Sequence, residues 1–109
     1  MGNQTREVSF LWDKVENTYI VNPPIIYEVE PGDTVIFNSP DSNAKISFLD
    51  SGIINITGWE TIDKGKHITK EVGSLVNDGT YYYAVMCEHE DRKYWYAEGN
   101  SCPAMKVGP

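Results

Sequence analysis

The sequence lacks several features that would place it in a large functional class. Its 109 residues carry 9 Lys and Arg against 16 Asp and Glu, a formal net charge of −7. Nucleic-acid binding depends on clustered basic side chains that neutralise phosphates, so this balance argues against a nucleic-acid partner. No apolar run approaches the ~20 residues of a membrane span, and no apolar stretch of a signal peptide follows Met1 to Arg6.

Catalytic motifs are missing as well. The sequence contains no nucleophile elbow, no glycine-rich phosphate loop and no HExxH zinc motif. The acidic residues Glu88, Glu90 and Asp91 lie close together, but basic neighbours in the same polar segment would neutralise them. We therefore predict that the protein is not an enzyme.

Helical periodicity is absent too, and short β patterns take its place. Runs of about five residues alternate apolar and polar side chains, with Gly, Pro, Asn and Asp between the runs. About eight strands in this arrangement imply an all-β sandwich or small barrel. Residues 53–59 fit no pattern. The predicted runs are 8–12 (which 19–21 continues or pairs with), 25–29, 34–38, 45–49, 67–72, 80–86, 94–96 and 105–107.

The length suits one domain, because independent domains usually have ~100–150 residues. We assign residues 1–6 to a disordered N-terminal segment or cloning remnant and residues 7–109 to the domain. The clearest turn is at 30–33. There Pro31 fixes φ at the second position, and Gly32 supplies the positive φ that a type II turn needs at the third.

Two segments resemble the cupredoxin family. Residues 29–38, Val-Glu-Pro-Gly-Asp-Thr-Val-Ile-Phe-Asn, are similar to its V-x-x-G-D-T-V-x-F-x-N signature between the second and third strands. Residues 79–87 and 105–107 resemble its G-x-Y-x-(Y/F)-x-C…H…M closing hairpin. The resemblance implies a cupredoxin-like Greek-key β-sandwich of about eight strands, and an immunoglobulin-like sandwich is the competing fold.

Copper-binding members of this family use two His, one Cys and a weak axial Met. The resemblance places Cys87 at the thiolate position, but Ala44 stands where the first His is expected. We therefore expect no copper and no other cofactor. The alternative is a copper electron-transfer protein with a rearranged ligand set, consisting of Cys87, His89, His67 and Met105.

The two cysteines leave two interpretations open. Cys87 ends a predicted strand and Cys102 begins the next, and residues 101–106 resemble the phytocyanin segment with a Cys shortly before the axial ligand. A bridge would close a loop of 14 residues and add ~3 kcal/mol in the chain-entropy model. We predict this disulfide, and with it a periplasmic, cell-surface or secreted protein whose signal peptide has been removed. Two separate buried thiols are the alternative.

Charged and aromatic residues near the cysteines form the predicted interaction surface. Exposed aromatic side chains are enriched at recognition surfaces. On a strand, Tyr94 and Tyr96 would point one way and Trp95 the other. The resemblance places the loop before Ala44 at the same end of the sandwich. We predict a non-enzymatic binding or interaction domain with a protein or carbohydrate partner. Its surface residues are Asp41, Asn43, Arg92, Lys93, Tyr94, Trp95 and Tyr96.

Overall fold

The computed structural model describes residues 4–50, 52–90, 93–98 and 102–108. Ten strands form the regular structure of these residues, and none of them lies in a helix that could cross a membrane. The strands are β1 (Thr5–Asp13), β2 (Thr18–Asn22), β3 (Ile25–Val29), β4 (Thr34–Ser39), β5 (Ala44–Phe48), β6 (Glu60–Ile62), β7 (Lys66–Glu71), β8 (Gly79–Glu88), β9 (Tyr94–Tyr96) and β10 (Ala104–Val107).

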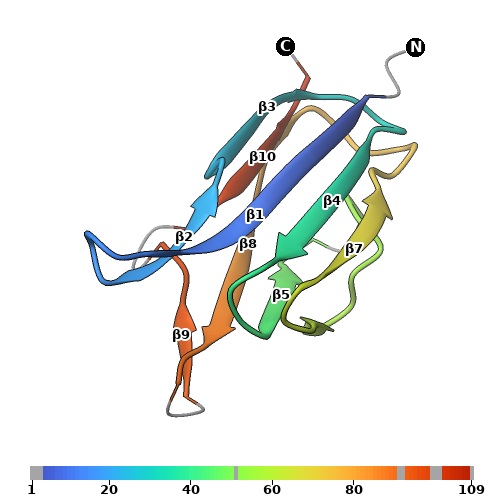
Figure 1. The fold of residues 1–109 in the computed structure, drawn as a ribbon. Coiled ribbons are helices and arrows are strands. Elements are labelled where there is room, and N and C mark those ends of the chain that lie inside the picture. The colour runs from blue at the N-terminus through green and yellow to red at the C-terminus, as the bar shows by residue number, and fades with distance from the viewer. Residues whose placement is uncertain (1–3, 51, 91–92, 99–101, 109) are drawn as a thin grey trace.

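The strands form two sheets that pack face to face (Figure 1). One sheet has the order β2-β1-β4-β7, and the other has the order β3-β10-β8-β5-β6 with β9 beside β8. Neighbouring strands are antiparallel except in the pairs β1–β4 and β3–β10, which are parallel. The predicted all-β sandwich is confirmed, with ten strands in place of about eight.

Alternate residues of each strand face inward and form one core. In β4, Val35 and Phe37 are fully buried. The Phe37 ring contacts Phe48 and Tyr83 of the opposite sheet, with ring centroids 6.2 and 5.9 Å apart. Such aromatic pairs add to the free energy of burial. Phe37 therefore joins the two sheets at the centre of the sandwich.

The segment 53–59, which fitted no pattern, fills the core without forming a strand. Ile53, Ile54 and Ile56 are buried, and Ile54 makes one isolated β-bridge to Val72. The short strand β6 follows this segment and was not predicted. Three residues are too few to display the alternation by which strands are recognised.

The first strand begins earlier than predicted. Thr5 and Arg6 already pair with Thr34 and Val35 of β4. The prediction that residues 1–6 are disordered is therefore wrong for these two residues, while residues 1–3 lie outside the described part of the chain. The parallel neighbour β4 supplies the backbone partners that extend β1 toward the N-terminus.

One buried carboxylate holds the start of β1 against the predicted turn. Gly32 has a φ of 89°, and the Asp33 N–H donates to the Glu30 carbonyl (3.0 Å), as expected for a type II turn. The Asp33 side chain is fully buried and accepts from the backbone N–H groups of Gln4 and Glu30, both at 2.9 Å. Arg6 Nε lies 3.9 Å from the same carboxylate.

A second polar clamp covers an edge of the four-stranded sheet. The Glu98 N–H donates to the Tyr19 carbonyl (2.9 Å), and the Glu98 carboxylate accepts from the Val21 N–H (2.7 Å). Glu98 has a φ of 66°, a conformation that is unfavourable for a residue with a side chain. The segment between β9 and β10 thereby binds the outer edge of β2.

The sandwich is elongated, with principal extents of 43 × 22 × 21 Å. The loops after β1, β4, β6 and β8 gather in the lower half of the molecule as drawn in Figure 1. We call this end the loop pole, and it comprises residues 14–17, 40–43, 63–65 and 89–90. Binding residues are often held on loops that a rigid scaffold positions.

We predict that Asp33→Ala lowers the free energy of unfolding by about 2–4 kcal/mol, because it removes a buried carboxylate that accepts two partly buried backbone N–H groups and faces Arg6. Urea unfolding measures this loss. The matched control is Asp50→Ala, since Asp50 is exposed and, among the described residues, its carboxylate accepts only from the Gly52 N–H two residues away. Equal urea midpoints for the two variants would contradict the role of Asp33.

Candidate binding site

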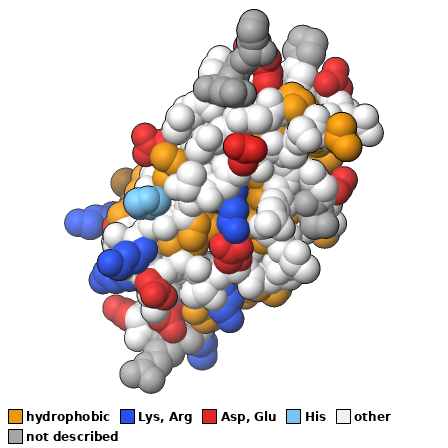
Figure 2. All heavy atoms as spheres, turned by 90° about the vertical axis from the view of Figure 1, so that its right-hand side faces the viewer, with side chains coloured by type: hydrophobic (Ala, Val, Ile, Leu, Met, Phe, Trp, Pro, Cys, Tyr) orange, Lys and Arg blue, Asp and Glu red, His pale blue; other side chains and the backbone are white. Residues whose placement is uncertain are grey.

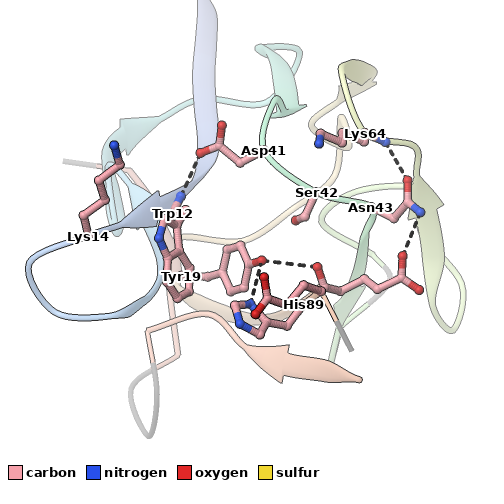
Figure 3. Close-up of a pocket in the computed structure, with 10 residues that line it drawn as sticks. Trp12, Lys14, Tyr19, Asp41, Ser42, Asn43, Lys64 and His89 are labelled. Carbon is pink, nitrogen blue, oxygen red and sulfur yellow. Dashed lines mark hydrogen bonds between the residues drawn. The ribbon is translucent and has the colours of Figure 1, made fainter. Parts of the chain in front are cut away.

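The four loops of the loop pole surround an open pocket of about 620 Å³ (Figure 3). This volume lies within the range of small-molecule sites, about 300–1,000 Å³. Carboxylates, lysines, an amide, a hydroxyl and aromatic rings all line it. The lining residues are Trp12, Lys14, Tyr19, Asp41, Ser42, Asn43, Lys64, Glu88, His89 and Glu90.

One wall of the pocket is a cluster of aromatic rings. Trp12 and Tyr19 are partners across the β1–β2 hairpin, and their rings meet edge to face at 4.9 Å. The His89 ring stacks on Trp95 at 4.0 Å and lies 5.0 Å from the Trp12 ring. The Tyr19 hydroxyl donates to the Glu88 carbonyl (3.2 Å) and lies 3.3 Å from His89 Nδ1. These contacts fix the orientation of the imidazole.

The loop between β4 and β5 is tied to the other three loops. Asp41 Oδ2 accepts from the Trp12 N–H at 2.8 Å. Asn43 Oδ1 accepts from the Lys64 N–H at 2.7 Å, and Asn43 Nδ2 donates to Glu88 Oε1 at 2.9 Å. The Asn43 carbonyl also accepts from the Glu88 N–H at 2.8 Å. The pocket is therefore organised by hydrogen bonds within the protein.

A buried hydroxyl without a well-formed hydrogen bond lies beneath this loop. Ser42 is only 4% exposed, and its Oγ has no hydrogen bond of normal geometry to any described residue. The Cys87 thiol and the Tyr19 hydroxyl make weaker contacts with it, and in Figure 3 its hydroxyl points toward the Tyr19 hydroxyl. The nearby Ser39 hydroxyl, by contrast, donates to the Ser42 carbonyl. A buried polar group that stays unpaired costs roughly 1–3 kcal/mol, so Ser42 requires an explanation.

The thiol of Cys87 lies under the pocket and is fully buried. Burial raises the pKa of Cys87 to about 11, against a smaller opposing effect of the Ser42 hydroxyl, while Asp41 adds to the rise. Burial and the neighbouring Cys87 also raise the pKa of the Tyr19 hydroxyl. Cys87 is therefore a protonated, inert thiol near neutral pH, because the thiolate is the reactive form.

The predicted disulfide is not formed in this structure. Both cysteines are free, with Cys87 buried and Cys102 exposed. The pairing of β10 with β8 places residue 102 level with Ala84, three residues or ~10 Å short of Cys87. Trp95 of β9 occupies the position opposite Cys87 on that side. The bridge prediction is therefore wrong here, and its alternative of two buried thiols holds only for Cys87.

The four copper ligands of the alternative prediction do not come together. His67 is exposed on β7, in the opposite sheet from Cys87. Met105 pairs with Tyr81, which lies six residues or ~20 Å along β8 from Cys87. Only His89 shares the loop pole with the thiol. No three His, Cys, Asp or Glu side chains are placed to hold a metal within the described ranges.

Ala44, which the resemblance places where the first histidine is expected, lies beside the thiol. Ala44 is the direct partner of Cys87 across β5 and β8, and both residues are fully buried. The Ala44 methyl group has no atom that can bind a metal. The residues at this pole therefore do not fit a type 1 copper centre, which needs a second imidazole beside the thiolate.

The predicted interaction surface divides between two faces of the molecule. Asp41 and Asn43 line the pocket, and Trp95 packs behind it. Tyr94 and Tyr96 lie on the other face of β9, so the predicted alternation is confirmed. Lys45 Nζ is 4.4 Å from the Tyr94 ring centroid, and Tyr96 is 54% exposed.

The remaining two predicted surface residues lie in the loop between β8 and β9. The Lys93 carbonyl accepts from the His89 N–H at 2.7 Å and so holds His89 in the loop. Arg92 lies outside the described residues.

Of the ten residues that line the pocket, only Asp41 and Asn43 belong to the predicted interaction surface, and His89 was expected only as an alternative copper ligand. The sequence does contain a pattern that indicates two of these lining residues, Trp12 and Tyr19. Trp12 and Tyr19 flank a polar stretch between two β runs, so a hairpin there would place the two rings side by side. The contribution of Lys64 depends on contacts between segments far apart in the chain.

No protein-family model matches the sequence, and no curated protein matches it. Solved structures do match, and they are cupredoxins. The chain has the cupredoxin fold. A pseudoazurin from Sinorhizobium meliloti is 24% identical, with a TM-score of 0.55, over 97% of this chain and 75% of that one.

Two further structures agree with this cupredoxin fold. A point mutant of amicyanin in its reduced Cu(I) form at pH 4 is 14% identical, with a TM-score of 0.59, over 98% of this chain and 85% of that one. A purple cupredoxin from Nitrosopumilus maritimus is 17% identical, with a TM-score of 0.57, over 94% of this chain and 99% of that one. Identities this low establish the fold and leave the chemistry to the residues of the loop pole.

We predict that a thiol reagent such as Ellman's reagent modifies one cysteine of the native protein, Cys102, and both cysteines after unfolding. The reason is that Cys87 is fully buried and its pKa is raised to about 11. Native Cys102→Ser should release no chromophore. A parent protein that reacts with neither thiol, even when unfolded without reductant, would show a disulfide and contradict the free thiols.

Proposed function

We propose that the protein is a non-enzymatic binding domain that takes a ligand in the pocket of the loop pole and has no type 1 copper centre. The observation that carries this proposal is the Ser42 hydroxyl, which belongs to a pocket-lining residue and is buried without a hydrogen bond of normal geometry to any described residue. The hydroxyl oxygen is closed to solvent as it stands, and a rotation of this short side chain would bring it to a hydrogen-bonding group of a bound molecule.

The rest of the pocket supports the same function. Asn43 joins three of the four loops, and Asp41 joins the hairpin that carries Trp12. The lining is thus held in one arrangement before any ligand arrives, which lowers the entropic cost of binding. A few polar groups in a preformed concave site are typical of ligand recognition.

Copper electron transfer, the alternative, is disfavoured by the donor set. A type 1 site needs two imidazoles around the thiolate. Here Ala44 replaces one imidazole, Met105 lies far along β8, and the His89 ring is stacked on Trp95. The partner of the binding domain is then a protein or a carbohydrate that contacts the loop pole.

We also propose that the protein acts outside the cytoplasm. This proposed location is supported by the similarity of the fold to the cupredoxins. The cysteine pair no longer supports it, because Cys87 and Cys102 are not bridged in the structure.

A pair of serine variants tests whether Ser42 serves binding. Ser42→Ala should leave the free energy of unfolding unchanged or raise it by about 1 kcal/mol, because it removes an unpaired buried hydroxyl. Ser39→Ala should lower it by about 1–2 kcal/mol, because it removes a hydrogen bond to the Ser42 carbonyl. Thermal or urea unfolding measures both. An equal loss in the two variants would make Ser42 a structural residue and remove the support for the pocket.

Copper titration tests the other half of the proposal. Adding Cu(II) to the reduced protein should produce no intense visible thiolate-to-copper band, because Cys87 is buried, protonated and without two neighbouring imidazoles. Cys87→Ser is the control. A band in the parent protein that this variant abolishes would overturn the proposal in favour of copper.

A further inference from the structure

We propose that the ligand of the pocket is a neutral carbohydrate, one or a few sugar rings long. This inference rests on the proposed function, that the pocket binds a ligand. It follows from the charges around the pocket, from its aromatic wall and from the hydroxyl at its base.

The charges around the pocket favour a neutral ligand. Three carboxylates (Asp41, Glu88 and Glu90) and two ammonium groups (Lys14 and Lys64) line it. In Figure 3, Lys14 and Lys64 lie on opposite sides with Asp41 between them. The two signs nearly balance, three against two, so attraction and repulsion largely offset each other for an anion or a cation and the lining selects neither strongly by charge.

These charged groups are also available to a ligand. Within the described residues, neither lysine Nζ takes part in an ion pair or hydrogen bond, and the Glu90 carboxylate has no such partner either. The face of the molecule beside β7 likewise mixes both signs in its lower half (Figure 2). A sugar hydroxyl both donates and accepts, so one polyol can pair with carboxylates and ammonium groups at once.

The aromatic wall suits the apolar side of a sugar ring. Trp12 lines the pocket, and its ring is held by Tyr19 at 4.9 Å and by His89 at 5.0 Å. Rigid aromatic rings provide contact area at a low cost in conformational entropy. The C–H groups of a pyranose can lie against such a ring while the hydroxyls at its edge reach the charged side chains.

The base of the pocket supplies a specific contact. Ser42 lines the pocket, and once its side chain rotates toward the ligand its Oγ can both donate to a sugar hydroxyl and accept from one. The pocket volume of about 620 Å³ is large for a single ring, which extends the proposal to short oligosaccharides. A zwitterionic amino acid or a peptide segment would satisfy fewer of the five charged groups, and both are outcomes of the test.

The test is a titration of the ¹⁵N-labelled full chain, followed by amide chemical shifts. The probes are maltotriose, cellotriose and triacetylchitotriose, with glutamate, spermidine and a neutral Gly-Ser-Gly peptide for comparison. We expect at least one trisaccharide to shift amides of the loop pole. Ser42→Ala should weaken that binding about five- to tenfold, the loss of one hydrogen bond. Ser47→Ala, on the outer face of β5, should bind as the parent does.

The outcomes separate this inference from the proposed function. If only glutamate, spermidine or the peptide shifts the pocket amides, the carbohydrate inference fails and the binding domain stands. If no trisaccharide shifts these amides, or if shifts appear only at Tyr94 and Tyr96, the inference also fails. The proposed function itself fails on the separate results above, an equal loss of stability in the two serine variants or a copper band that depends on Cys87.

Discussion

The register of β8 between β5 and β9 determines what the loop pole can contain. It places Ala44 on one side of Cys87 and Trp95 on the other. Two residues beyond Cys87, His89 lies on the same side of the chain. Its ring therefore stacks on Trp95 and faces the hairpin of β1 and β2. A methyl group, a thiol and an indole close the core at this point. The charged and amide groups that line the pocket above it come from the surrounding loops and from Glu88 at the end of β8.

The parts of this structure that local chemistry determines were predictable from the sequence. Pro31 and Gly32 specify their turn by the φ angles that they permit, and alternation located most strands. The position of Ala44 beside Cys87 followed from a resemblance that spans both strands. The bridge to Cys102 was wrong because β9, only three residues long, inserts beside Cys87. The pocket was missed for a related reason, since its walls come from four separate loops.

The loops of the loop pole are held to one another by side-chain hydrogen bonds. The Asn43 amide spans the loops after β4, β6 and β8, and Asp41 reaches the hairpin. Ring stacking holds His89, which would otherwise be an exposed imidazole at the end of a strand. Each of these interactions is individually modest, about 1 kcal/mol for a neutral hydrogen bond. At the loop pole they leave the Ser42 hydroxyl without a well-formed hydrogen bond, and among the three buried polar atoms in this state (with Arg6 Nε and the Tyr83 hydroxyl) it belongs to a residue that lines the pocket.

The clamp made by Glu98 has a consequence for how copies of this protein meet. Open sheet edges are templates on which another chain can add a strand, and β2 is such an edge. Glu98 occupies the outward Tyr19 carbonyl and Val21 N–H with its own N–H and carboxylate, as a short piece of neighbouring strand would. A second molecule cannot extend the sheet there unless Glu98 leaves. The residue in the unfavourable conformation thus acts as a guard against edge-to-edge aggregation.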